Sequence, residues 1–299
     1  MKIEQVPKKF QPEYKSVYPS YSNGLHMEEI FFKYFEENKD SIETEYIYLP
    51  IFWTSFYILR NYAANINDLM EYLDKLDKSK KYFTIIQYAS GICVKNKNLN
   101  LLVFSAGGGG INMRHEINQK VTIDRNPNRV IFVGKKADYD IPLMCEPLMK
   151  YEEKSKDIFC SFMGRLNTHN CRYDMANTVR ADNRYQLKGS SGYDAYRDIL
   201  SRSLFSLSPR GYGYTSFRIY EAIQMESIPI YVWDKEKVLP FSDEINWEEF
   251  CIIIHTSELN KLREIVDKAD KSKMLEALKK YKPMFTFEET FKYMVRKLK

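Results

Sequence analysis

The residues of this 299-residue chain with the clearest chemical potential lie between Leu204 and Asp234. In the segment LFSLSPRGYGYTSFRIYEAIQMESIPIYVWD, a strand pattern ends at Pro209 and a glycine-containing loop follows. A helix, which Thr215 or Ser216 can cap, comes next, and a second strand ends at Asp234. A loop that opens a helix presents free backbone N–H groups and a partial positive charge. The segment therefore predicts a phosphate-binding strand–loop–helix unit.

The side chains of this segment suit a diphosphate joined to a ribose. Gly211 and Gly213 allow a ligand to approach the backbone closely. Arg210 and Arg218 could contact the diphosphate, because a guanidinium binds two oxyanions at once. Glu221, one turn after Arg218, can accept hydrogen bonds from vicinal hydroxyls. A simpler alternative is that Arg218 and Glu221 form an i,i+3 pair on a surface helix.

The same loop is also consistent with a second class of protein. The run from Gly211 to Ser216 has G-x-G-x-x-S spacing and Asp234 closes the next strand, which is similar to an imperfect dinucleotide fingerprint. An NAD-dependent oxidoreductase is thus an alternative. The third glycine is missing, however, two arginines flank the loop, and the unit lies in the second half of the chain.

The longer run SPRGYGYTSFRIYEAIQMESIPIYVWDKEKVLPFSDEINWEEF closely resembles the signature of the exostosin-like glycosyltransferases. That signature has PRG, SFR-x-x-EA, IPV, LPF and INW in this order. Weaker similarity extends to residues 46–56, 106–110 and 138–142, and to Phe162–Arg165 followed by Arg172.

The resemblance implies an α/β protein of GT-B type, with two Rossmann-like domains facing a central cleft. It implies an inverting, metal-independent glycosyltransferase that requires no cofactor, uses a nucleotide sugar, most simply a UDP-sugar, and transfers to a glycan or glycoprotein acceptor. Arg172 and Arg218 would contact the diphosphate, Glu221 the ribose, and the Arg210–Gly211 loop the nucleotide. The implied donor-binding residues are Gly164, Arg165, Arg172, Arg210, Gly211, Thr215, Ser216, Phe217, Arg218 and Glu221.

An inverting displacement needs a general base near the acceptor hydroxyl, normally a carboxylate of the first domain. Related chains often carry an acid just after a strand like residues 85–88, where this chain has Ala89-Ser90-Gly91. The alternative candidates for the base are Asp138, Asp140, Glu146 and His115. The missing acid also leaves open a non-catalytic partner subunit that binds nucleotide sugar or glycan.

Two short motifs allow more than one interpretation. Asp138-Tyr139-Asp140 has the D-x-D spacing of a metal site, but its place beside Ile141-Pro142 favours a domain-linking turn, so no metal site is expected. The run Gly107, Gly108, Gly109 and Gly110 follows a strand and could cradle a phosphate or admit an acceptor. A tight turn explains the same glycines equally well.

The elements that must position these residues form two α/β halves of similar size, predicted as domains 1–150 and 151–299. The first half has strand patterns at 46–50, 82–88, 101–104 and 130–133 and a helix pattern at 69–81. The second has strand patterns at 158–163, 204–208, 228–233 and 251–254, with helix patterns at 171–180, 193–203, 216–225, 257–269 and 271–280. Residues 287–299 predict an amphipathic helix that packs back on the body.

Composition agrees with a globular protein: 44% of residues are hydrophobic, 28% are charged, and the net charge is +5 with the two signs interleaved. This excess suits an anionic ligand but is too small for nucleic-acid binding. The five scattered cysteines form no C-x-x-C pair, which favours reduced thiols. The N-terminal residues lack a signal-peptide core and the most apolar stretch, 46–59, is too short to span a bilayer. These features predict a cytoplasmic setting, bacterial or viral.

Overall fold

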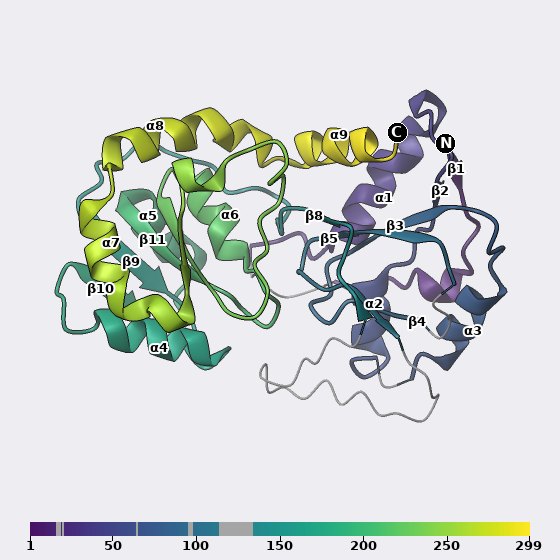
Figure 1. Cartoon of the computed structure of the whole chain (residues 1–299), viewed down its shortest axis with the longest axis horizontal. Coiled ribbons are helices and arrows are strands. Elements are labelled where there is room, and N and C mark those ends of the chain that lie inside the picture. Colours follow the sequence, from purple (N-terminus) through teal and green to yellow (C-terminus); the bar gives the residue numbers. More distant parts are fainter. Residues whose placement is uncertain (16–18, 20, 64, 95–97, 114–133) are drawn as a thin grey trace. The chain divides into compact units, whose positions relative to one another are not determined.

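The computed structural model describes residues 1–15, 19, 21–63, 65–94, 98–113 and 134–299. The chain divides into two compact units (Figure 1). Unit 1 comprises Met1–Glu146 and Phe287–Lys299, and unit 2 comprises Pro147–Thr286. Each unit contains a five-stranded sheet in which all paired strands are parallel, so the predicted α/β class is confirmed.

The sheet of unit 1 has the strand order β1-β2-β3-β5-β8. Its strands are β1 (Lys2–Ile3), β2 (Ile47–Tyr48), β3 (Tyr82–Ile86), β5 (Leu101–Ser105) and β8 (Tyr139–Asp140). Every residue of β3 is buried, as expected for a central parallel strand covered on both faces. The helices of this part are α1 (Met27–Asn38), α2 (Trp53–Leu59) and α3 (Asn67–Lys75), and α1 packs on β3.

A smaller sheet in unit 1 explains the four consecutive glycines. It consists of β4 (Ile92–Val94), β6 (Ile111–Met113) and β7 (Gly134–Lys135), and the glycine run joins β5 to β6. A Cβ at Gly107 would lie 2.1 Å from the carbonyl oxygen of Gln87, and one at Gly110 would lie 2.2 Å from that of Lys135. These glycines therefore allow backbone segments to pack directly on one another. The predicted strand at 130–133 lies outside the described residues.

The helix α9 (Phe287–Lys297) belongs to unit 1, although the predicted second domain extended to residue 299. Its apolar face packs on the aromatic face of α1. The ring centroids of Phe287 and Phe31 are 6.0 Å apart, and those of Phe291 and Phe35 are 5.0 Å apart. The amphipathic stripe predicts the helix, but only the matching aromatic surface on α1 shows where it packs.

The sheet of unit 2 has the strand order β10-β9-β11-β12-β13. Its strands are β9 (Ile158–Met163), β10 (Tyr185–Lys188), β11 (Ser203–Pro209), β12 (Ile228–Trp233) and β13 (Ile252–His255). Its helices are α4 (Asn170–Val179), α5 (Tyr193–Arg202), α6 (Phe217–Gln224), α7 (Leu262–Lys268) and α8 (Lys271–Tyr281). Helix α4 leads from β9 out to the edge strand β10, and α5 brings the chain back to β11 (Figure 1). The direction of the chain through the sheet thus reverses between β9 and β11.

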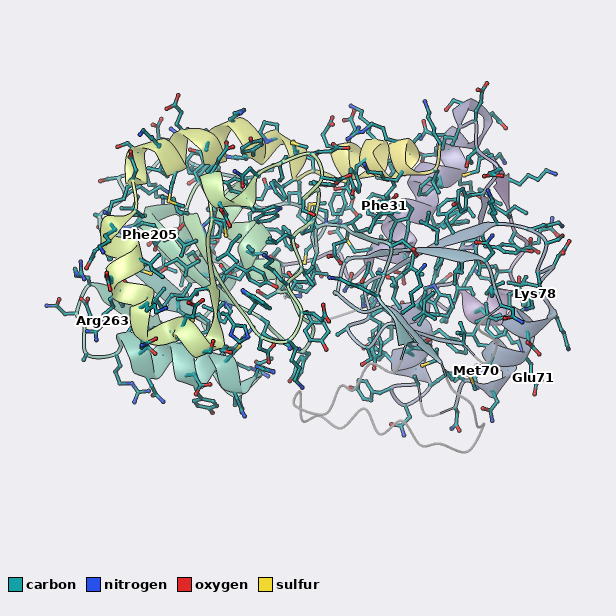
Figure 2. All side chains as sticks on the ribbon, viewed as in Figure 1. Phe31, Met70, Glu71, Lys78, Phe205 and Arg263 are labelled. Atoms are coloured by element: carbon teal, nitrogen blue, oxygen red, sulfur yellow. The ribbon has the colours of Figure 1, made fainter. Side chains whose placement is uncertain are left out.

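Each unit buries its own set of apolar side chains. Phe31 in unit 1 and Phe205 in unit 2 are fully buried, whereas Arg263 on α7 is exposed (Figure 2). The five cysteines are free and buried. Among the residues that the structure describes, no helix has the length and apolar character needed to cross a membrane.

Candidate functional site

The predicted donor-binding residues converge in unit 2 at the carboxyl ends of β9 and β11. Gly164 directly follows β9, Arg210 directly follows β11, and α6 begins at Phe217 after the loop. In open parallel sheets, ligands bind where neighbouring strands lead off in opposite directions, because the loops there diverge and leave a crevice. The reversal between β9 and β11 is that position in this unit.

Arg218 is a buried cation at this crevice. It is 8% exposed, its Nη2 donates to the carbonyl oxygen of Met163 at 2.5 Å, and its guanidinium carbon lies 4.4 Å from the centroid of the Phe162 ring. Its Nε has no hydrogen-bond partner, and no carboxylate in the described part of the chain forms an ion pair with it. The alternative of a surface pair with Glu221 is therefore wrong. A buried guanidinium with an unused donor calls for an anion from outside the chain.

Gly164 makes room for this arginine. A Cβ at residue 164 would lie 2.5 Å from Nη2 of Arg218, and the φ angle of +155° is one that residues with a side chain rarely adopt. Glycine at this position therefore allows the guanidinium to lie directly over the end of β9.

Arg172, in the first turn of α4, joins the two loops of the crevice. Its Nε donates to the carbonyl oxygen of Arg210 at 2.8 Å, and its Nη1 donates to that of Arg165 at 2.9 Å. Its Nη2 lies 3.4 Å from the position that a Cβ on Gly211 would take. This arginine holds the loop after β9 against the loop after β11, and its guanidinium remains beside the glycine.

Arg210 shapes the loop from inside. It is 2% exposed, and its Nε, Nη1 and Nη2 donate to Gly213 O at 2.9 Å, Asp234 Oδ1 at 2.5 Å and Tyr212 O at 3.1 Å. Every guanidinium nitrogen is thus engaged within the protein. The sequence predicts that Arg210 contacts the ligand, but its guanidinium donates to the protein's own loop and to Asp234 instead. Asp234, which an NAD-binding protein would offer to a ribose, is occupied by this arginine.

His169 lies close to the positively charged arginines of the crevice. It caps α4, with Nδ1 accepting from the backbone N–H of Cys171 at 3.2 Å, and its Nε2 lies 3.6 Å from Asp234. Burial and the charge of Arg210 lower the pKa of His169 to about 4, against the opposing effect of Asp234. The imidazole is therefore neutral at physiological pH, and the arginines carry the positive charge of the site.

The start of α6 supplies further donors. Ser216 is the N-cap residue, but its side chain makes no capping bond, and its buried Oγ has no hydrogen-bond partner among the described residues. Thr215 closes the loop, because its carbonyl oxygen accepts from the backbone N–H of Gly211 at 3.0 Å. Phe217 is the first residue of the helix. A free hydroxyl at a helix N-terminus can bind an anion.

Glu221 lies one turn further along α6 and is half-buried. Its Oε2 accepts a hydrogen bond from Tyr196 OH on α5 at 2.5 Å. The tyrosine fixes the position of the carboxylate, and a carboxylate oxygen can accept further hydrogen bonds.

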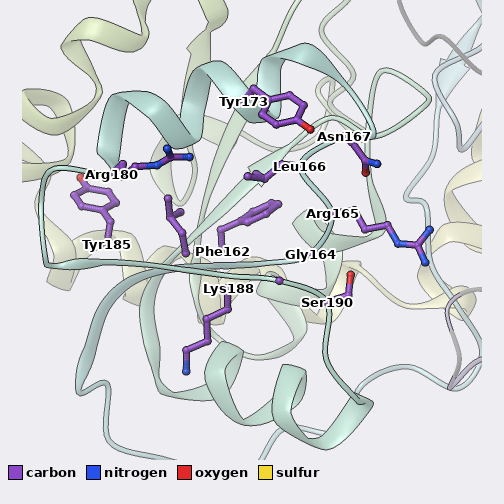
Figure 3. A pocket seen from close by; sticks show the side chains of 12 residues that line it. Phe162, Gly164, Arg165, Leu166, Asn167, Tyr173, Arg180, Tyr185, Lys188 and Ser190 are labelled. Atoms are coloured by element: carbon purple, nitrogen blue, oxygen red, sulfur yellow. The ribbon is translucent and has the colours of Figure 1, made fainter.

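A cavity of about 840 Å³ adjoins the crevice (Figure 3). It extends from Gly164 and Arg165 along β10 and the outer part of α4, and all its lining residues belong to unit 2. Its walls carry the rings of Phe162, Tyr173 and Tyr185 and the cationic side chain of Lys188. Aromatic surface beside cationic groups suits a base or sugar attached to a phosphate.

Two of the predicted candidates for the general base, Asp138 and Asp140, have structural places in unit 1. Asp138 is engaged in the fold, since it accepts from the backbone N–H of Val103 at 2.9 Å and pairs with Lys135 at 2.5 Å. Asp140 lies in the edge strand β8, so the D-x-D motif is part of the sheet rather than a domain-linking turn.

The other two candidates are Glu146 and His115. Glu146 ends the first segment of unit 1, and its carbonyl oxygen accepts from the backbone N–H of Asn23. His115 lies outside the described residues. No cluster of three or more metal-ligating acidic, histidine or cysteine side chains occurs in the described ranges.

The sequence reasoning missed a second polar cluster in unit 1. His26, Glu28 and Glu29 lie at the start of α1 and are buried together with Ser55 of α2. The signal for this cluster is the run His-Met-Glu-Glu at the beginning of an amphipathic helix. That run also fits an exposed helix start, and only the tertiary structure shows that it is buried.

Comparison with protein families identifies one match. The family model described as Exostosin GT47 domain matches residues 94–269. A probable glycosyltransferase of Arabidopsis thaliana is 39% identical over 71 residues, which are 24% of this chain and 15% of that protein. The Exostosin-1 homolog of Caenorhabditis elegans is 27% identical over 139 residues, 46% of this chain and 34% of that protein. The matched part thus spans about a third or less of these relatives.

Two solved structures show a distant similarity. TarM aligns with a TM-score of 0.42 and 8% identity, over 88% of this chain and 56% of its own. The pneumococcal O-GlcNAc transferase GtfA in complex with UDP and GlcNAc aligns with a TM-score of 0.37 and 11% identity, over 78% of this chain and 59% of its own.

Proposed function

Because the chain belongs to the exostosin GT47 domain family, we propose that it is a glycosyltransferase that takes its sugar from a nucleoside diphosphate donor, a UDP-sugar. The observation that carries the proposal is the buried guanidinium of Arg218, which has an unused Nε and no carboxylate partner in the described part of the chain. The diphosphate of the donor is the anion that would compensate this charge.

The diphosphate would bind over Gly164 and the N-terminus of α6. Arg218 lies over the end of β9, the buried hydroxyl of Ser216 has no hydrogen-bond partner among the described residues, and Arg172 lies beside Gly211. These groups are held by the fold before the ligand arrives, so little reorganisation is needed when it binds. Glu221, fixed by Tyr196, would accept hydrogen bonds from the ribose hydroxyls.

The reaction would be a single displacement with inversion. The acceptor oxygen attacks the anomeric carbon, the bond from that carbon to the diphosphate breaks, and negative charge develops on the leaving phosphate oxygen. Arg218, Arg172 and the N-terminus of α6 would stabilise this charge. Because these cationic and dipolar groups already meet the diphosphate, we propose that transfer to a glycan proceeds without a divalent ion.

Calorimetric titration with UDP tests the donor site, with EDTA present throughout. Arg218→Met keeps the length of the side chain and removes the charge. Losing a charge-assisted hydrogen bond costs about 1.5–3 kcal/mol, so UDP affinity should fall about 10- to 150-fold. Arg263→Met, at an exposed arginine of α7, is the matched control and should bind UDP like the unaltered protein.

Three outcomes separate the candidate functions. UDP binding together with UDP release from a UDP-sugar supports the glycosyltransferase. UDP binding without turnover of any UDP- or GDP-sugar in a panel indicates a partner subunit that binds the donor. Binding of NAD in place of UDP would overturn the proposal.

A further inference from the structure

The buried polar cluster of unit 1 is not used by the proposed donor site. His26 is 3% exposed, Glu28 is 1% exposed, and Glu29 and Ser55 are also buried. Taking ionisable groups out of water is costly, and proteins retain them in the interior when they are paired or take part in function.

The cluster lies at the carboxyl ends of the unit 1 strands. Gln87 directly follows β3, its backbone N–H donates to Glu28 Oε1 at 3.1 Å, and its side-chain oxygen accepts from the backbone of Met27 at 3.0 Å. Gly107, in the loop that follows β5, packs on the carbonyl oxygen of Gln87. This is the edge at which parallel α/β sheets bind their ligands.

The hydrogen bonds of His26 determine which ring nitrogen carries the proton. Ser55 Oγ donates its hydrogen to Glu29 Oε1, so its oxygen must accept from the Nδ1–H of His26, 3.0 Å away. Glu29 Oε1 is also 3.6 Å from Nδ1, and Glu29 Oε2 accepts from the backbone N–H of His26 at 3.0 Å. In the neutral imidazole this arrangement favours a proton on Nδ1, which leaves Nε2 with a lone pair, and the described ranges offer Nε2 no hydrogen-bond partner.

We propose that His26 is the general base of the transfer reaction, with its ring oriented by Glu29 and Ser55. The inference rests on the proposed function. As the acceptor oxygen bonds to the anomeric carbon, its proton passes to Nε2 of His26. The electron pair of the broken bond leaves with the diphosphate, and the imidazolium later returns its proton to water.

The surrounding charges suit a base that works near neutral pH. Burial opposes the charged imidazolium, but the hydrogen bond to Glu29 and the charges of Glu28 and Glu29 outweigh it, so the pKa of His26 is raised above its ordinary value. Among the described residues, two tyrosines also lie at this cluster. Tyr14 stacks on the ring with centroids 6.0 Å apart, and the pKa of buried Tyr48 is raised, so Tyr48 stays neutral. A general base is most effective when its pKa is close to the operating pH.

The decisive variant is His26→Asn. The asparagine amide can replace Nδ1 in the bond to Ser55 and is a favourable N-cap for α1, whereas nothing replaces Nε2. His255→Asn is the matched control, because His255 also precedes a helical turn (Thr256–Lys261) and its Nδ1 lies 2.7 Å from Ser257 Oγ.

The assay measures UDP release from UDP-glucuronate, UDP-glucose and UDP-N-acetylglucosamine, with p-nitrophenyl glycosides as acceptors, and UDP affinity by calorimetry. For His26→Asn we expect kcat to fall about 10²- to 10⁴-fold while UDP affinity stays within twofold. His26→Ala should be partly rescued by added imidazole, which a purely structural role would not allow. Unchanged turnover in a folded His26→Asn protein would overturn the assignment.

Glu29→Gln tests the positioning role separately. It removes the charge and weakens the hydrogen bond that together raise the pKa of His26, so the acid limb of the kcat/KM profile should move to lower pH. An unshifted limb contradicts the role of Glu29. If the unaltered protein neither binds UDP nor releases it from any of these donors, the proposed function itself fails. If the unaltered protein binds UDP and releases it from a donor, and the folded His26→Asn variant has the same rate, only the assignment of His26 as the base is wrong.

Discussion

The substitution Gly164→Ala tests the donor site through a steric effect rather than through removal of a charge. A Cβ at residue 164 would lie 2.5 Å from Nη2 of Arg218, whereas ordinary contacts begin at 3.4 Å. The guanidinium must therefore move by about 0.9 Å, which stretches its 2.5 Å bond to the carbonyl oxygen of Met163 to the limit of hydrogen bonding. Because the displaced atom ends a flexible side chain, the fold can accommodate the methyl group, but the guanidinium cannot keep its position.

Two effects of Gly164→Ala can be measured separately. The unusual φ angle should lower the free energy of unfolding by about 1–3 kcal/mol, measured in urea. The displaced guanidinium should weaken UDP binding about tenfold or more, measured by calorimetry, since a charge-assisted hydrogen bond contributes at least about 1.5 kcal/mol. Gly192→Ala is the matched control, because a Cβ there meets no atom within 4 Å and Gly192 does not line the cavity.

A double-mutant cycle shows whether the effect passes through Arg218. If it does, Gly164→Ala adds nothing to the loss of affinity already caused by Arg218→Met. Additive losses, or UDP affinity equal to that of the unaltered protein in a folded Gly164→Ala variant, would refute the assignment of the diphosphate to the end of β9.

Three further predictions concern stability and the adjoining cavity. Arg210→Ala should lower the free energy of unfolding by about 3–5 kcal/mol in urea, because it leaves Asp234 without its buried partner; a loss below 1 kcal/mol contradicts the structural role. Between pH 6.5 and about 4, the unfolded chain binds a proton at His169 that the folded chain does not, so stability falls as the pH is lowered through this range. His169→Asn preserves the helix cap and should make that dependence shallower, and an unchanged slope contradicts the pKa shift. Tyr173→Ala should weaken UDP but not pyrophosphate if its ring in the cavity stacks on the base, and equal affinity for UDP would place the base elsewhere.

That the predicted donor-binding residues lie close together could be foreseen from the sequence, because the parts of this crevice are local. A strand, a loop and a helix in succession bring Arg218 to the end of its own β–α unit, and Gly164 occupies the same position after a neighbouring strand. The role of Arg210 was not predictable in the same way. Its partners include Asp234, which follows the next strand, and carbonyl oxygens of a loop whose path depends on the folded structure.

The polar cluster of unit 1 was not found from sequence because its burial is a tertiary property. Glu28 and Glu29 have the spacing of acids in the first turn of an exposed helix. Thr54 and Gln87, which donate to Glu28, come from a different helix and from the end of a strand. Likewise, the apolar stripe of α9 indicates that one face is covered, but the aromatic side chains of α1 that cover it are more than 250 residues away in sequence.

The return of α9 to unit 1 has a consequence for the order of folding during synthesis. Unit 2 is an insertion within unit 1, since residues 147–286 are made before the segment that completes the first unit. Unit 2 therefore emerges from the ribosome with all its strands available, while the sides of Phe31 and Phe35 that α9 covers still lack their partner helix. A nascent chain that stalls before residue 287 would carry a complete unit 2 attached to an incomplete unit 1, and the uncovered aromatic surface of α1 would favour aggregation.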